Sequence, residues 1–203
     1  MIDTIIFDLG GVLVDFHPIE GMRKIGFSEK AVEEFENKIF SGLWEECDKY
    51  QYSDSQIRQL FKERVPGFEK EVDLLWNNLH SITGTRDYSN EWLEDLKARG
   101  YRLLVLSNFG KNSFEINSKI YDFLKYMDGG IISYELGLVK PDDAIYKALM
   151  EKYNIVPERA VFIDDREENV QAARALGING IVVENYEQAI RELERVCGWK
   201  LQL

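Results

Sequence analysis

Several short apolar runs of this chain are followed by acidic, hydroxyl, amide or basic side chains. In an open α/β sheet, ligands bind beyond the carboxyl ends of the strands, so polar residues at those ends are expected to meet at one edge. Carboxylates favour a hard divalent cation such as Mg²⁺, whereas a hydroxyl, an amide and an ammonium group favour an anionic substrate. The residues in question are Asp8, Ser107, Asn108, Lys140, Asp164 and Asp165.

Any single one of these residues could instead be a helix cap at the end of a strand, which is a common structural role for polar side chains. Their coincidence at one edge makes that interpretation weak. Asp164 and Asp165 are adjacent acids with no basic run beside them. The set therefore predicts a joint site for a divalent metal ion and an anionic substrate.

The elements that must position these residues are short buried strands separated by helices. Helical patterns ending near Gly100 and Gly177, and a further pattern after Pro141, alternate with the apolar runs. This alternation predicts an α/β fold with a doubly wound parallel sheet. The expected strands are Thr4–Phe7, Arg102–Leu106, Gly130–Ile132, Ala160–Ile163 and Gly180–Val183.

One segment departs from the alternation, because between about Pro18 and Thr85 the sequence shows no convincing strand and every periodic stretch is helical. We expect a small helical cap at 17–85, inserted after the first strand into a core formed by 1–16 and 86–203. The two linking segments could act as hinges. Within the cap, Gly42–Tyr52 mixes aromatic and charged residues, and helix packing is the favoured interpretation over a sugar-facing surface.

Four ordered motifs carry a resemblance to a known family. Asp8–Leu13, Leu106–Asn108, Lys140-Pro141 and Phe162–Asp165 resemble the motifs of the haloacid dehalogenase-like (HAD) hydrolases, with a cap between the first two. The similarity spans essentially the whole chain. The D-x-G-[GN]-V start further resembles the sugar-phosphate branch of the family, the glucose-1-phosphate-type phosphatases with a helical C1-type cap.

The resemblance implies an in-line displacement in which Asp8 attacks phosphorus and forms an aspartyl-phosphate that water hydrolyses. It further implies that Ser107 and the backbone amide of Asn108 hold the phosphoryl oxygens and that Lys140 offsets the negative charge. The substrate would be a small phosphorylated metabolite, with a sugar phosphate as the favoured class.

The resemblance also implies a Mg²⁺ cofactor held between Asp8, the carbonyl of Gly10 and Asp165. Asp164 would support the metal directly or through water. Asn169 is a candidate for orienting these ligands, although a solvated helix position is an equal alternative for it.

Gly10 is a departure from most phosphatases of the family, which carry there a second acid that protonates the leaving group. The loss of that acid would remove a contribution of about 10²- to 10⁴-fold in rate. Asp15 is the candidate for a substitute acid, and a turn or capping role is its more frequent alternative.

Three rival functions remain open. A haloacid dehalogenase would also lack the second acid, but Asp164 and Asp165 favour a metal and therefore phosphate chemistry. A phospho-aspartate receiver would carry its acid pair first in the chain, whereas here the pair comes last. A degenerate, non-catalytic HAD protein would bind Mg²⁺ without turnover.

Composition restricts the partners. The 25 Lys and Arg residues against 36 Asp and Glu residues give a formal charge of -11, which disfavours nucleic acid. No apolar run approaches the roughly 20 residues that span a bilayer, so no membrane partner is expected.

Cys47 and Cys197 show no paired pattern, which favours the reducing cytoplasm. Either a monomer or a homodimer is compatible with this sequence.

Overall fold

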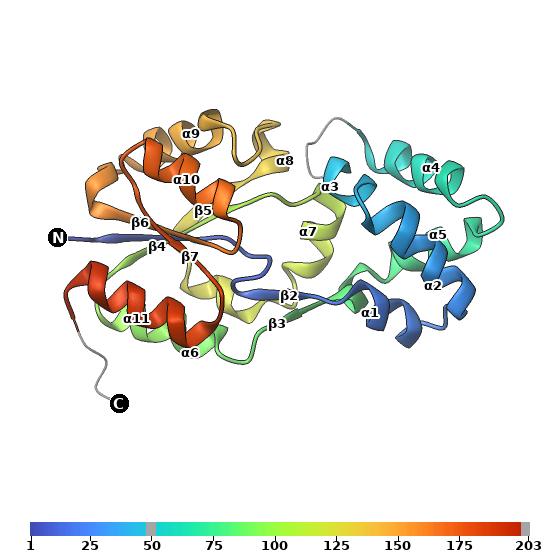
Figure 1. Ribbon diagram of the computed structural model, residues 1–203, viewed down its shortest axis with the longest axis horizontal. Coiled ribbons are helices and arrows are strands. Elements are labelled where there is room, and N and C mark those ends of the chain that lie inside the picture. Colours follow the sequence, from blue (N-terminus) through green and yellow to red (C-terminus); the bar gives the residue numbers. More distant parts are fainter. Residues whose placement is uncertain (48–51, 200–203) are drawn as a thin grey trace.

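Five parallel strands form the central sheet, in the order β5-β4-β1-β6-β7 (Figure 1). The computed structural model describes residues 1–47 and 52–199. The prediction of a doubly wound parallel sheet is confirmed, with strand bounds shifted by at most one residue. The strands are β1 (Thr4–Phe7), β4 (Arg102–Ser107), β5 (Gly129–Ile132), β6 (Ala160–Asp164) and β7 (Asn179–Val182).

Helices cover both faces of the sheet because alternate residues of each strand point to opposite sides. Ile5 and Phe7 belong to a core cluster with α6 (Ser89–Ala98) and α11 (Tyr186–Cys197). Ile6 belongs to a second cluster on the opposite face, which is completed by two other helices. These are α9 (Asp143–Tyr153) and α10 (Glu167–Ala175), and Figure 1 shows the two helix layers with the sheet between them.

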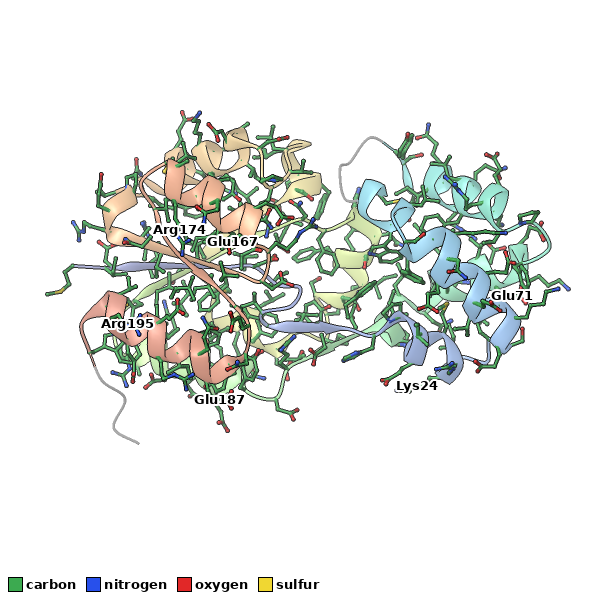
Figure 2. All side chains as sticks on the ribbon, in the orientation of Figure 1. Lys24, Glu71, Glu167, Arg174, Glu187 and Arg195 are labelled. Atoms are coloured by element: carbon green, nitrogen blue, oxygen red, sulfur yellow. The ribbon has the colours of Figure 1, made fainter. Side chains whose placement is uncertain are left out.

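The outer helices are amphipathic. In α11, Ala189 and Leu193 are fully buried against the sheet. Glu187 and Arg195 of the same helix are exposed and lie on its solvent side in Figure 2. The apolar stripe that faces the sheet is therefore what attaches this helix to the core.

The segment between the first two strands of the sheet is helical and has a hydrophobic core of its own (Figure 1). Ser53 begins one of its helices with a capping box, since its hydroxyl accepts from the Gln56 amide and the Gln56 side chain accepts from the Ser53 amide. The elements are α1 (Pro18–Lys24), α2 (Glu29–Phe35), the π-helical turn η1 (Glu36–Phe40), α3 (Leu43–Cys47), α4 (Asp54–Arg64), α5 (Glu69–Asn77) and the 3₁₀ turn η2 (Leu79–Ile82).

The two segments that link this helical part to the sheet pair with each other. β2 (Val14–Phe16) and β3 (Thr83–Thr85) form an antiparallel two-stranded ribbon. The expectation of no strand up to Thr85 is therefore wrong at its end. Three residues per strand carry too weak a periodic signal, and the two strands pair only where the ends of the helical segment come together.

Helix α7 (Lys111–Asn117) ties the core to the base of the helical part. The Thr83 hydroxyl donates to Oδ1 of Asn117 at 3.0 Å, and the Tyr121 hydroxyl donates to Thr83 at 3.1 Å. None of the helices in the described parts of the chain is long and apolar enough to cross a membrane. The remaining elements are η3 (Asp122–Tyr126), α8 (Ser133–Leu136) and η4 (Pro157–Arg159).

Candidate active site

Asp8 follows the central strand β1 and is 7% exposed. Its amide donates to the carbonyl of Ile163 at 2.9 Å, which extends the pairing of β1 with β6 by one residue. One carboxylate oxygen, Oδ1, accepts from the Leu9 amide at 2.7 Å and lies 2.9 Å from Nζ of Lys140. The carboxylate is thus fixed in direction at the carboxyl end of the sheet.

Lys140 reaches this edge from the loop between α8 and α9 and is 4% exposed. Its Nζ lies between two carboxylates, 2.9 Å from Asp8 and 2.6 Å from Asp164. The side chain of Asn108 holds the Lys140 backbone, because its Oδ1 accepts from the Lys140 amide at 2.9 Å and its Nδ2 donates to the Lys140 carbonyl at 3.0 Å. Asn108 therefore has a positioning role that the sequence did not indicate.

Asp164, at the end of β6, is completely buried. Besides Lys140, it accepts from the Arg166 amide at 2.8 Å and from Nδ2 of Asn169 at 3.0 and 3.1 Å. Asn169 is itself 3% exposed, and its carbonyl accepts from the Tyr146 hydroxyl at 2.9 Å. Of the two alternatives for Asn169, a solvated helix position is thus wrong, because this side chain orients Asp164.

Asp165 is exposed and faces the same cavity as Asp8. A Cβ atom on Gly11 would lie 2.2 Å from Oδ2 of Asp165, and Gly11 has a φ of +71°. Only glycine fits there, for both steric and backbone reasons. By contrast, a Cβ on Gly10 would meet nothing within 4 Å, so the position of the absent second acid is open space.

The carboxylates of Asp8, Asp164 and Asp165 each offer a ligand oxygen, and these atoms lie within 4.8 Å of one another. Burial raises the pKa of Asp8 from 3.8 to about 7, with Lys140 and Ser107 opposing that shift and Asp164 adding to it. Burial, and then Asp164, also raises the pKa of Asp165. Burial therefore disfavours the ionised forms of Asp8 and Asp165, and a bound cation would favour them.

At Lys140 the same surroundings favour the charged form. Burial disfavours its charge, but the carboxylates of Asp8 and Asp164 outweigh this and raise the pKa of the ammonium group above its usual value. Lys140 is consequently a permanent cation of the site rather than a proton donor near neutral pH.

Ser107 is 1% exposed at the end of β4, and a hydrogen bond links it to Asp8. The structure brings Asp8, Ser107, Asn108 and Lys140 together at one edge, as expected from the strand ends. All four, together with Gly10 and Asp165, line one cavity of about 420 Å³. That volume is in the lower part of the range of roughly 300–1,000 Å³ typical of small-molecule sites.

Asp15 also lines the cavity, but it lies in strand β2 of the ribbon rather than in a turn or a helix cap. Its Oδ1 lies 2.9 Å from Nε of Arg86, and its Oδ2 lies 3.7 Å from Nε2 of His17. The structural role expected for Asp15 is thus corrected, because the residue pairs across the ribbon and faces the site.

Three aromatic residues line the cavity, and of these only Trp44 lies in a segment for which the sequence raised a substrate-facing surface as an alternative. Phe16, Phe40 and Trp44 line it on the side of the ribbon and the cap helices. For Gly42–Tyr52, in which 48–51 lie outside the described residues, helix packing was favoured, and Trp44 does pack on Phe61 with ring centroids 6.2 Å apart. Trp44 nevertheless also faces the site.

Residues 2–177 match the haloacid dehalogenase-like hydrolase family. The chain belongs to this family. It is 28% identical to the phosphorylated carbohydrates phosphatase of Thermotoga maritima, over 88% of this chain and 83% of that protein. It is 26% identical to the D-ribitol-5-phosphate phosphatase of Bacteroides thetaiotaomicron, over 91% and 93% of the two chains.

A solved structure of an HAD family enzyme from Bacteroides thetaiotaomicron, in complex with magnesium and inorganic phosphate, has a TM-score of 0.71 to this chain. The identity is 28%, with 91% of this HAD chain and 95% of that one covered. The chain spans only 20% of mouse acyl-CoA dehydrogenase family member 10 and 18% of pig bifunctional epoxide hydrolase 2, two further curated relatives.

Proposed function

We propose that this HAD protein is a Mg²⁺-dependent phosphatase that hydrolyses a small phosphorylated metabolite of the sugar-phosphate class. The observation that carries the proposal is the cluster of Asp8, Asp164 and Asp165 at the carboxyl end of the sheet, with Lys140 between two of them. The relatives that act on phosphorylated carbohydrates and ribitol 5-phosphate, and the related enzyme that binds magnesium and phosphate, support it.

A divalent cation fits this donor set, because three carboxylates face a single ammonium group and hard oxygen ligands suit Mg²⁺. We propose that Asp8, Asp165 and the carbonyl of Gly10 would hold the ion, with Asp164 behind them. When bound, Mg²⁺ would offset the negative charge of the carboxylates and polarise the phosphoryl group.

The proposed first step is attack of an Asp8 carboxylate oxygen on phosphorus, with cleavage of the bond to the leaving oxygen. Ser107 and the amide of Asn108 would hold the phosphoryl oxygens, and Lys140 would stabilise the charge that develops between nucleophile and phosphate. Water would then attack the aspartyl-phosphate, release inorganic phosphate and regenerate Asp8.

Within the described part of the chain, the site holds no side chain that is poised to donate a proton to the leaving oxygen. Gly10 has no side chain to donate, and Asp15 would have to give up its ion pair with Arg86 in order to carry a proton. Asp15 remains the candidate catalytic acid. We propose that leaving groups able to depart as anions are favoured, namely anomeric, acyl and aryl oxygens rather than primary alcohols.

We further propose that 17–85 act as a cap domain over a core formed by 1–16 and 86–203, with the β2–β3 ribbon as the link. Cys47 and Cys197 form no disulfide, which is consistent with a cytoplasmic location. A monomer or a homodimer would place no additional requirement on the site, since all the residues named come from one chain.

Phosphate release from a panel of phosphorylated metabolites, measured with Mg²⁺ and with a chelator, tests the proposal. Turnover that requires Mg²⁺ supports it. Mg²⁺ binding without turnover on any phosphate ester would instead indicate a binding protein, and metal-independent turnover of a 2-halo acid would indicate a dehalogenase.

A further inference from the structure

Three aromatic rings from separate elements meet on the cap side of the cavity. Phe16 ends strand β2, Phe40 ends the π-helical turn η1, and Trp44 lies in α3. The ring centroids of Phe16 lie 5.8 Å from Phe40 and 5.6 Å from Trp44, and those of Phe40 and Trp44 are 5.1 Å apart. We call this cluster the aromatic wall.

The wall lies between the core of the helical part and the cavity, since Phe40 and Trp44 are half-buried and pack against that core while they also line the cavity. Phe16 is 43% exposed, an unusual fraction for a large apolar ring in contact with two others, and all three residues line the same cavity as Asp8. π-Helical turns are rare and occur frequently at functional sites, and here η1 ends on the wall residue Phe40. An apolar surface made of rings that are tilted against one another, at interplanar angles of 35° to 65°, therefore lines the cavity that also holds Asp8.

Charge is distributed unequally over the same cavity. Among the described lining residues, the cations are Lys140 and Arg166, and both belong to the core side. The ribbon and cap side contributes the carboxylate of Asp15 and the aromatic wall. Lys111 lines a neighbouring cavity that shares Trp44 and Ser113 with this one.

We propose that the leaving group of the substrate is an uncharged ring whose apolar face packs against the aromatic wall. The inference rests on the proposed phosphatase function and specifies its substrate class. A ring with an apolar face, whether an aryl ring or the C–H face of a sugar, gains contact area and stacking on such a surface. A second phosphate or a carboxylate on that ring is disfavoured, because it would lose water against apolar rings. The Arg86 side chain on this side of the cavity is already paired with the Asp15 carboxylate.

The size of the cavity agrees with this class. About 420 Å³ holds a phosphoryl group together with one ring, and the lining cations Lys140 and Arg166 belong to the core side rather than to the aromatic wall. The preference is thus for a monophosphate of a ring-sized neutral alcohol.

The first experiment compares glucose 1-phosphate with glucose 1,6-bisphosphate, and phenyl phosphate with 4-carboxyphenyl phosphate. We expect kcat/KM to be at least about tenfold higher for the neutral leaving group in each pair. Equal or better turnover of the two more anionic substrates would overturn the proposal. The sugar and aryl pairs show separately which kind of ring the wall prefers.

The second experiment removes single rings. Phe16→Ala and Trp44→Ala should each lower kcat/KM for phenyl phosphate and glucose 1-phosphate by about three- to tenfold, mainly through KM. Acetyl phosphate has an acidic leaving group but no ring, so its turnover should be unchanged in these variants. Phe68→Ala is the matched control, since Phe68 is a half-buried aromatic residue of the same helical part that lies outside the cavity.

These measurements separate the two proposals. If the wild-type protein hydrolyses neither acetyl phosphate nor any ester, the proposed function fails. If it hydrolyses acetyl phosphate and both ring-removing variants treat phenyl phosphate and glucose 1-phosphate like wild type, the wall proposal alone fails. Phe16→Lys supplies a gain-of-function test at an exposed position, with the bisphosphate expected to improve several-fold relative to the monophosphate.

Discussion

Lys140 lies in the core between two buried carboxylates at 2.9 and 2.6 Å, whereas Trp44 on the other side of the cavity packs against Phe16 and Phe40 at centroid distances above 5 Å. The core side is held by directional, charge-assisted bonds, and each group has a defined partner. The cap side is held by apolar contact, which is largely non-directional.

The difference indicates that the two sides of the cavity serve different functions, with catalysis on the core side and substrate selectivity on the cap side. A buried carboxylate that loses its partner leaves an uncompensated charge, so the core side tolerates little change. A ring on the wall can be exchanged for another apolar group at modest loss, so the cap side can vary with the substrate. Substitutions on the core side should therefore affect catalysis on all substrates, and those on the wall should affect selectivity.

Asp8→Asn is the most severe test of the core side. The amide is a poor nucleophile and removes one negative ligand, so turnover should fall by at least about 10⁴-fold on every substrate. Phosphate release is the measurement, and an unchanged circular dichroism spectrum serves as the control for folding. Appreciable activity in this variant would contradict the covalent mechanism.

Asp165→Ala should weaken Mg²⁺ binding by about ten- to a hundredfold, since it removes a charged oxygen that faces the cavity. Activity should return in part at high Mg²⁺ concentration. Isothermal titration of Mg²⁺ checks this assignment. An affinity equal to that of wild type would show that Asp165 is no metal ligand.

Gly10→Asp adds the absent acid at a position where a Cβ atom meets nothing within 4 Å. The rate on primary-alcohol phosphates such as glucose 6-phosphate should rise by about tenfold or more, with a smaller gain on aryl phosphates, which need no proton. Leaving-group series for both proteins give the measurement. Asp15→Asn should change the wild-type rates on aryl and acyl phosphates by no more than a few-fold, because these leaving groups need no proton.

The opposite result would assign the proton to Asp15. A wild-type protein indifferent to leaving-group acidity, together with a large loss in Asp15→Asn on primary-alcohol phosphates, would show that Asp15 leaves its ion pair with Arg86 during turnover.

The smallest expected effect is on stability. In the metal-free protein the pKa of Asp8 is about 7 when folded and near 3.8 when unfolded. The folded state then holds the extra proton, so this group makes the protein less stable as pH rises from about 4 to 7. Mg²⁺ favours the ionised carboxylate and should raise Tm by about 5 °C at pH 8 but by less at pH 5.5.

Thermal unfolding at the two pH values, with and without Mg²⁺, measures this difference. Asp8→Asn provides the control, because it lacks the titrating group and should lose part of the pH dependence. An equal Mg²⁺ effect at both pH values would contradict the linkage between Asp8 and the metal.

Much of the core side was readable from the sequence because the relevant signals are local. A polar residue that ends an apolar run, such as Asp8 after Thr4–Phe7, lies at the carboxyl end of its strand whatever the rest of the chain does. The capping box at Ser53 is likewise complete within four residues. Parallel pairing then brings the strand ends to one edge.

Which residues line the cavity on the cap side was decided by the tertiary structure. Phe16, Phe40 and Trp44 come from a strand, a π-helical turn and a helix, and each would pass as ordinary core packing in its own segment. The β2–β3 ribbon is too short to form without the cap that joins its ends. The hydrogen bond of Asn169 to Asp164 depends in the same way on how α10 docks on β6. Local rules act over a few residues, whereas these contacts depend on where separate elements pack.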